Sequence, residues 1–117
     1  MKEKEIKGED YRIFYDSEGT IINFQGDLSL EGAKEYEPII ELLENVVSNA
    51  PSQITLDLKE LAFLNSSGIS MLSKFVLSFR NNNQIQLVIL GSDEMPWQKK
   101  SLKNLKKLLP NLTLEIN

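Results

Sequence analysis

Two neighbouring hydroxyl groups offer the clearest chemistry in this chain. Ser66 and Ser67 lie between Asn65 and Gly68, and an apolar stripe with spacings of three and four residues continues from there to Phe79. The pattern predicts that both serines lie in the first turn of a helix, where Asn65 or Ser66 caps the unpaired backbone N–H groups. Such a helix start stabilises negative charge, including that of a phosphate.

A catalytic role for Ser66 is not expected. A nucleophilic serine needs a nearby base, and the chain contains no histidine. Lys74 follows Ser66 by eight residues, a rise of about 12 Å along a helix, which is out of reach. Because cysteine is absent as well, the usual metal ligands are missing. We therefore expect neither an enzyme nor a cofactor nor a metal site.

Phosphorylation of Ser66 fits the pattern better than catalysis does. Ser67 is the less favoured phosphorylation site. A phosphoserine adds close to two negative charges and three acceptor oxygens. The helix dipole tolerates this charge, so we expect little change in the fold and a partner affinity weakened about a hundredfold or more. The alternative interpretation of Asn65 to Gly68 is an ordinary helix cap without a regulatory role.

The surrounding residues resemble a known family. The predicted strand Ile54 to Leu58, the predicted loop Lys59 to Leu64 and the sequence Asn65-Ser66-Ser67-Gly68 are similar to the STAS domains, the anti-sigma factor antagonists. The resemblance implies that a partner kinase phosphorylates the serine at position 66. It also implies that the unphosphorylated form binds an anti-sigma factor or another switch-type serine kinase, and that phosphorylation ends this interaction.

Two positions depart from the family pattern, because aspartate commonly stands where this chain has Asn65 and Ser29. Two alternative functions therefore remain open. The first is a STAS-like interaction module that is not phosphorylated. The second is a small-molecule or nucleotide-binding domain, with a phosphate held at the helix start or by the lysine-rich helix from Trp97 to Leu109.

The expected partner surface combines two loops, Gly26 to Ser29 and Leu64 to Gly68, with the exposed side of the helix that follows. Met71 belongs to this surface if it faces outward. The predicted partner-binding residues are Asp27, Leu28, Ser29, Leu64, Asn65, Ser67, Gly68, Ser70, Ser73 and Lys74.

Hydrophobic periodicity predicts five strands and three helices in the order β-β-α-β-α-β-α-β. Strands separated by helices pair in parallel, so we expect a mixed sheet in an α/β domain of the STAS type, with the helices mainly on one face. The predicted strands are 11–15, 20–25, 54–58, 86–90 and 112–116, and the predicted helices are 31–49, kinked at Pro38, 66–80 and 97–109.

Length and charge limit the remaining possibilities. The chain has 117 residues, enough for one domain at 11–117, preceded by a charged tail or edge strand at 1–10. The net charge is −4, and residues 1–60 hold 14 of the 17 acidic residues, so nucleic acid is not an expected partner. Without an apolar run of membrane length or a signal peptide, the sequence predicts a cytoplasmic protein that does not bind membranes.

Overall fold

A computed structural model describes residues 5–82 and 84–117 of the chain. Residues 1–4 of the expected tail, and Asn83 in the predicted turn after the second long helix, lie outside the described residues. Within the expected tail, Glu5–Lys7 forms a short edge strand, β1, which pairs antiparallel to the next strand. No helix in the described part of the chain is both long enough and apolar enough to cross a membrane.

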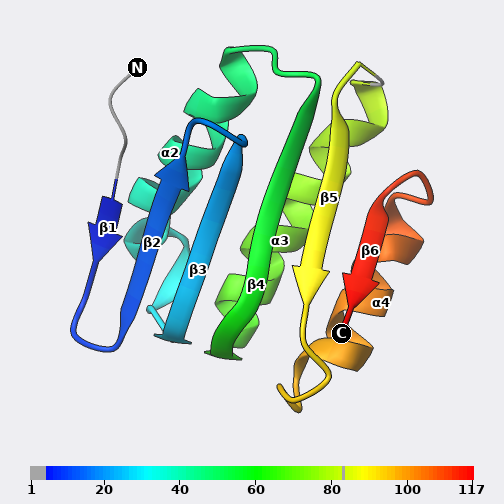
Figure 1. The fold of residues 1–117 in the computed structure, drawn as a ribbon. Helices are drawn as coiled ribbons and strands as arrows, with labels where there is room; N and C mark the ends of the chain where they lie inside the picture. The colour runs from blue at the N-terminus through cyan, green and yellow to red at the C-terminus, as the bar shows by residue number, and fades with distance from the viewer. Residues whose placement is uncertain (1–4, 83) are drawn as a thin grey trace.

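One six-stranded sheet contains every described strand, and the strands lie side by side in chain order (Figure 1). β1, β2 and β3 are antiparallel neighbours, whereas β3, β4, β5 and β6 run parallel. The bounds of the remaining strands are β2 Tyr11–Asp16, β3 Ile21–Leu28, β4 Gln53–Leu64, β5 Gln86–Gly91 and β6 Thr113–Ile116.

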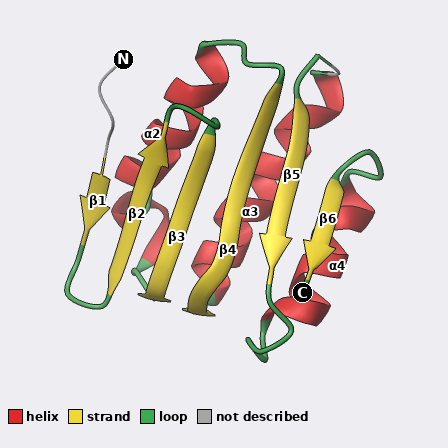
Figure 2. Ribbon diagram, in the orientation of Figure 1, coloured by secondary structure: helices red, strands yellow, loops and turns green. Residues whose placement is uncertain are grey.

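The helices all cover the same face of the sheet, and the other face is open (Figure 2). This arrangement follows from parallel strands joined by right-handed helical connections, and it confirms the predicted α/β fold class. Leucine, isoleucine and valine side chains from both layers meet in a single core. The helices are α1 Gly32–Glu35, α2 Glu37–Ser48, α3 Ser66–Leu77, which continues as the short 3-10 helix η1 Ser78–Asn81, and α4 Gln98–Leu108.

The predicted kinked helix from Glu31 to Asn49 is in fact two helices. Tyr36 separates α1 from α2, and Pro38 lies in the first turn of α2. Proline has no N–H for the carbonyl four residues earlier, and its ring collides with that carbonyl in a continuous helix. The break turns Tyr36 into the core, where its side chain is completely buried.

Two predicted loops are strand. Lys59 to Leu64 continues β4, and Gly26 to Leu28 ends β3; the two segments pair in parallel up to the Leu28–Leu64 pair. Two bulges each place an extra residue in β4 and disturb the alternation of polar and apolar side chains on which the prediction depended. Gly26 has a φ of 91°, a backbone conformation that favours glycine.

Candidate functional site

The N-terminus of α3 is capped by Asn65, one of the two residues that the sequence offered for this role. The Asn65 backbone is extended, and its side-chain Oδ1 accepts a hydrogen bond from the Gly68 N–H at 2.9 Å. The Asn65 carbonyl accepts from the Ile69 N–H, also at 2.9 Å. The cap leaves Ser66 as the first residue of the helix.

Asn65 also fixes the chain segment that follows β3. Its Nδ2 donates to the Leu30 carbonyl at 2.7 Å, and its backbone N–H donates to the Leu28 carbonyl at 3.2 Å. The Tyr36 hydroxyl donates to Asn65 Oδ1 at 2.6 Å and accepts from the Leu30 N–H at 3.4 Å. One amide therefore joins the start of α3, the end of β3 and the break between α1 and α2.

The amide of Asn65 is used as both donor and acceptor, which explains the departure from aspartate at this position. An ionised carboxylate only accepts hydrogen bonds, so it would face the Leu30 carbonyl without a proton between them. A larger residue does not fit at Gly68, because a Cβ at this position would lie 2.7 Å from the Tyr36 hydroxyl oxygen. Burial raises the pKa of Tyr36, so its hydroxyl keeps its proton at neutral pH.

The Ser66 side chain is exposed and Ser67 is partly exposed. Within residues 5–82 and 84–117, the Ser66 hydroxyl makes no hydrogen bond to another side chain, so no base activates it as a nucleophile. It lies at the positive end of the α3 dipole, beside backbone N–H groups that an anion can use. The Ser66 hydroxyl is therefore accessible at the surface, at a helix start.

The structure divides the predicted partner-binding residues by exposure. Asp27, Ser29, Ser70 and Lys74 are exposed, and Asn65, Ser67 and Ser73 are partly exposed. The side chains of Leu28 and Leu64 and the backbone of Gly68 are buried, so these three residues affect a partner only by positioning their neighbours. Met71 does not face outward as considered, because only 6% of it is exposed.

Phe63 is an exposed aromatic residue that the sequence interpretation missed. Its side chain is 47% exposed, more than that of any other large apolar residue in the described part of the chain. It pairs in parallel register with Asp27 and precedes Ser66 by three residues. The bulges in β4 turn Phe63 outward, and no simple alternation pattern predicts this.

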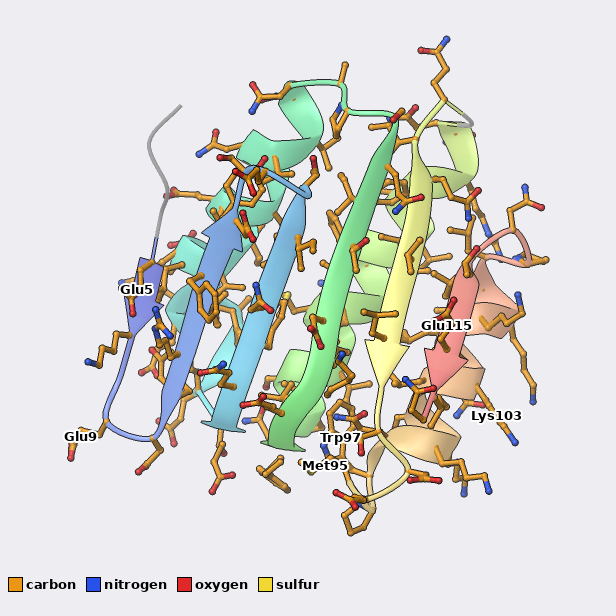
Figure 3. The ribbon with its side chains drawn as sticks, in the orientation of Figure 1. Glu5, Glu9, Met95, Trp97, Lys103 and Glu115 are labelled. Atoms are coloured by element: carbon orange, nitrogen blue, oxygen red, sulfur yellow. The ribbon has the colours of Figure 1, made fainter. Side chains whose placement is uncertain are left out.

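The start of α4 closes the other side of β4. β5 pairs with β4 only as far as Asp57, and beyond that point the buried Gln98 donates to the carbonyls of Leu58 and Leu61. Trp97 Nε1 also donates to the Leu61 carbonyl, at 2.9 Å. Leu61 lies within β4, and Figure 3 shows Trp97 beside the end of this strand. Trp97 directly precedes α4 and also packs against the core.

The lysine-rich helix presents its charges to solvent. Lys99, Lys100, Lys103 and Lys107 are exposed, and Lys103 points away from the sheet (Figure 3). Lys106 differs, because its Nζ donates to the carbonyls of Pro110 and Leu112. These carbonyls follow the helix C-terminus, so this lysine stabilises the end of the helix. Among the described residues, no three acidic side chains converge on a point where a metal ion could bind.

Three solved structures with the same fold are of SiaC from Pseudomonas aeruginosa. Apo-SiaC has a TM-score of 0.78 at 16% identity, covering 100% of this chain and 99% of that one. A second SiaC structure has a TM-score of 0.69 at 17% identity, covering 99% and 96%. SiaC as the activator bound to the diguanylate cyclase SiaD has a TM-score of 0.66 at 15% identity, covering 97% and 99%. At these identities the similarity shows the fold.

No curated protein matches the chain. A family model gives more specific evidence than the solved structures do. The STAS domain model matches residues 11–114, nearly the whole sequence. This match agrees with the six-stranded mixed sheet and with a capped helix start directly after a central strand. The chain therefore belongs to the STAS domain family.

Proposed function

We propose that this STAS domain is a regulatory binding module whose partner affinity is controlled by phosphorylation of Ser66. The observation that carries the proposal is the exposed Ser66 hydroxyl, held at the first position of α3 by the Asn65 network. The network joins Asn65 to Gly68, Tyr36 and Leu30, and none of these hydrogen bonds involves the Ser66 hydroxyl. A phosphate would therefore alter the surface and leave the fold intact.

The proposed contact surface surrounds Ser66 at the end of β3 and β4. Asp27 and Ser29 lie on one side, and Ser70 and Lys74 continue along α3. Phe63 adds an exposed aromatic ring to this surface, a residue type enriched where proteins bind one another. The combination of an apolar contact and a modifiable hydroxyl favours a protein partner over a nucleotide.

The partner class that the family suggests is a switch-type serine kinase or an anti-sigma factor. Such a kinase would bind the unmodified domain, phosphorylate Ser66 and then dissociate, because two added negative charges must lose their hydration in the interface. A diguanylate cyclase is the second candidate, since SiaC, whose fold is similar, is an activator of such an enzyme.

Mass spectrometry of the protein isolated from its own cells tests the modification. We expect one phosphate on Ser66 in the unaltered protein and none in Ser66→Ala. The matched control is Ser70→Ala, which removes an exposed hydroxyl one turn further along α3 and should keep the phosphate. If no phosphate is found during growth, starvation or stress, regulation by phosphorylation is refuted.

Binding assays then separate the two partner classes. Purified switch-type kinases and diguanylate cyclases from the same organism are titrated with the unmodified and the phosphorylated domain. We expect an affinity difference of about a hundredfold between the two forms for the true partner. Equal affinities would leave the domain as a binding module that phosphorylation does not control.

A further inference from the structure

A second surface lies away from Ser66, in a groove between α2 and α3. The groove has a volume of about 480 Å³ and is formed by the two helices along most of their length. α3 packs closely against α4, but α2 and α3 stand apart. The apolar residues that line the groove are Ile40, Leu43, Val47, Met71, Phe75 and Phe79.

The groove has a buried floor and partly exposed walls. Leu43, Met71 and Phe79 are almost inaccessible to solvent, whereas Val47 and Phe75 are only partly buried. The Phe75 and Phe79 rings make an edge-to-face contact with centroids 5.0 Å apart, which fixes the wall on the α3 side. An apolar side chain that entered the groove would cover surface which the fold leaves in contact with water.

α2 carries more apolar surface than the sheet requires. Ile39, Leu42 and Val46 are buried against the core, and a second row of apolar residues lies beside them in the groove. Ile40 and Val47 of this second row pack against the core but are only partly buried, so part of their apolar surface is exposed in the groove.

The shape of the groove favours an elongated occupant. Its lining runs from Ile40 to Ser48 on α2, which corresponds to about 12 Å of helix axis, and from Met71 to Asn82 on α3. Two to three turns of a third helix match this length, and amphipathic helices commonly bind in apolar grooves.

The charges at the rim define the complementary helix. Glu44 lies on the α2 side and Lys74 on the α3 side, and both are exposed. Within the described residues neither takes part in an ion pair. An occupant with a basic side chain toward α2 and an acidic side chain toward α3 would pair with both, in one orientation only.

We propose that the α2–α3 groove is a receptor for an amphipathic helix of a partner protein, with apolar residues on one face, a basic residue on one flank and an acidic residue on the other. This surface shares Lys74 with the contact surface around Ser66 and otherwise consists of different residues. The inference does not depend on whether Ser66 is phosphorylated.

A phage library that displays amphipathic helices tests the proposal on the complete chain. We expect the selected helices to share apolar residues at spacings of three and four, with opposite charges on the two flanks. One selected helix, made as a fluorescent peptide, is then titrated by fluorescence anisotropy. Phe75→Ser should weaken its binding about tenfold or more. Phe14→Ser, a control at a partly exposed phenylalanine of β2, should leave it unchanged.

Charge reversal provides a test that does not touch the floor of the groove. In Glu44→Lys combined with Lys74→Glu, both substitutions are exposed, so the domain should remain folded. The variant should prefer a peptide with exchanged flank charges about fivefold over the original. The proposal is overturned if no helix is selected or if Phe75→Ser has no effect on peptide binding. It is also overturned if the groove binds a small apolar dye but no helix.

Discussion

The N-termini of α3 and α4 are held by the same kind of side chain, yet only one of them is open to a partner. Asn65 and Gln98 each use an amide as donor and acceptor next to the end of β4. Gln98 is completely buried, and its amide replaces the strand that no longer pairs with β4. Asn65 is partly exposed and is followed by the exposed Ser66.

This difference separates a covered helix start from an accessible one. The bonds of Gln98 supply partners to the Leu58 carbonyl and the Ser92 N–H, and Gln98 shares the Leu61 carbonyl with Trp97. The bonds of Asn65 hold a helix start in place while its first hydroxyl remains free. An amide side chain at the end of β4 can thus either seal the edge of the sheet, as buried Gln98 does, or support an accessible helix start, as partly exposed Asn65 does.

The largest effect on stability should come from Gln98→Leu. The substitution leaves the Leu58 carbonyl and the Ser92 N–H without their partners, while Trp97 still donates to Leu61. One buried carbonyl and one partly buried N–H without partners predict a loss of about 3 kcal/mol in the free energy of unfolding. Urea denaturation followed by circular dichroism measures it, and a loss below about 1 kcal/mol would contradict the sealing role.

Asn65→Asp tests whether the fold needs the hydrogen bond that Asn65 Nδ2 donates to the Leu30 carbonyl. At pH 7 the introduced carboxylate would face the Leu30 carbonyl, and we expect a loss of about 2 kcal/mol. The carboxylate can still accept from the Gly68 N–H and the Tyr36 hydroxyl, so the loss reports the missing donor. Urea denaturation at pH 7 measures it, and a loss below about 0.5 kcal/mol would show that the donor is not needed.

Tyr36→Phe removes the hydroxyl that joins Asn65 to the helix break, and should cost about 1 kcal/mol at neutral pH. Burial raises the pKa of Tyr36 above its usual value of 10.0. The stabilisation is therefore complete below pH 10 and is lost as the pH rises through the pKa of the folded state. Urea titrations at pH 7 and above pH 10 should show the unaltered protein approaching the variant in stability. A constant difference would argue against this coupling.

Ser66→Ala should have the smallest effect on stability, within about 0.5 kcal/mol, because the exposed hydroxyl makes no hydrogen bond within the described residues. Thermal unfolding beside Asn65→Ala measures the contrast, since the loss of the cap should lower the melting temperature clearly. If Ser66→Ala were as destabilising as Asn65→Ala, Ser66 would be part of the structural cap.

The residues that sequence patterns predicted best are those with local signals. Asn65 was one of two expected caps, and the apolar stripe of α3 indicated the helix that follows it. Pro38 indicated a disturbance in the first long helix, although its outcome, a complete break at Tyr36, depends on how that side chain packs. Local patterns worked where the interactions lie within one or two helical turns.

The residues that were missed or misplaced depend on distant partners. Phe63 and the end of β4 were assigned to a loop because bulges disturb the alternation, and the pairing with β3 decides that the segment is strand. Nothing near Gln98 in the sequence indicates that its amide reaches β4, 40 residues away. The same limit applies to Leu28 and Leu64, whose burial results from the sheet and the helices together.

The sequence by itself determined the family, the order of strands and helices, and the position of an available hydroxyl at a helix start, because each depends on periodicity or on adjacent residues. Tertiary structure decided which residues surround that hydroxyl, why position 65 needs an amide, and that α2 and α3 leave a groove between them. These properties arise from hydrogen bonds and packing between segments that only the folded sheet brings together.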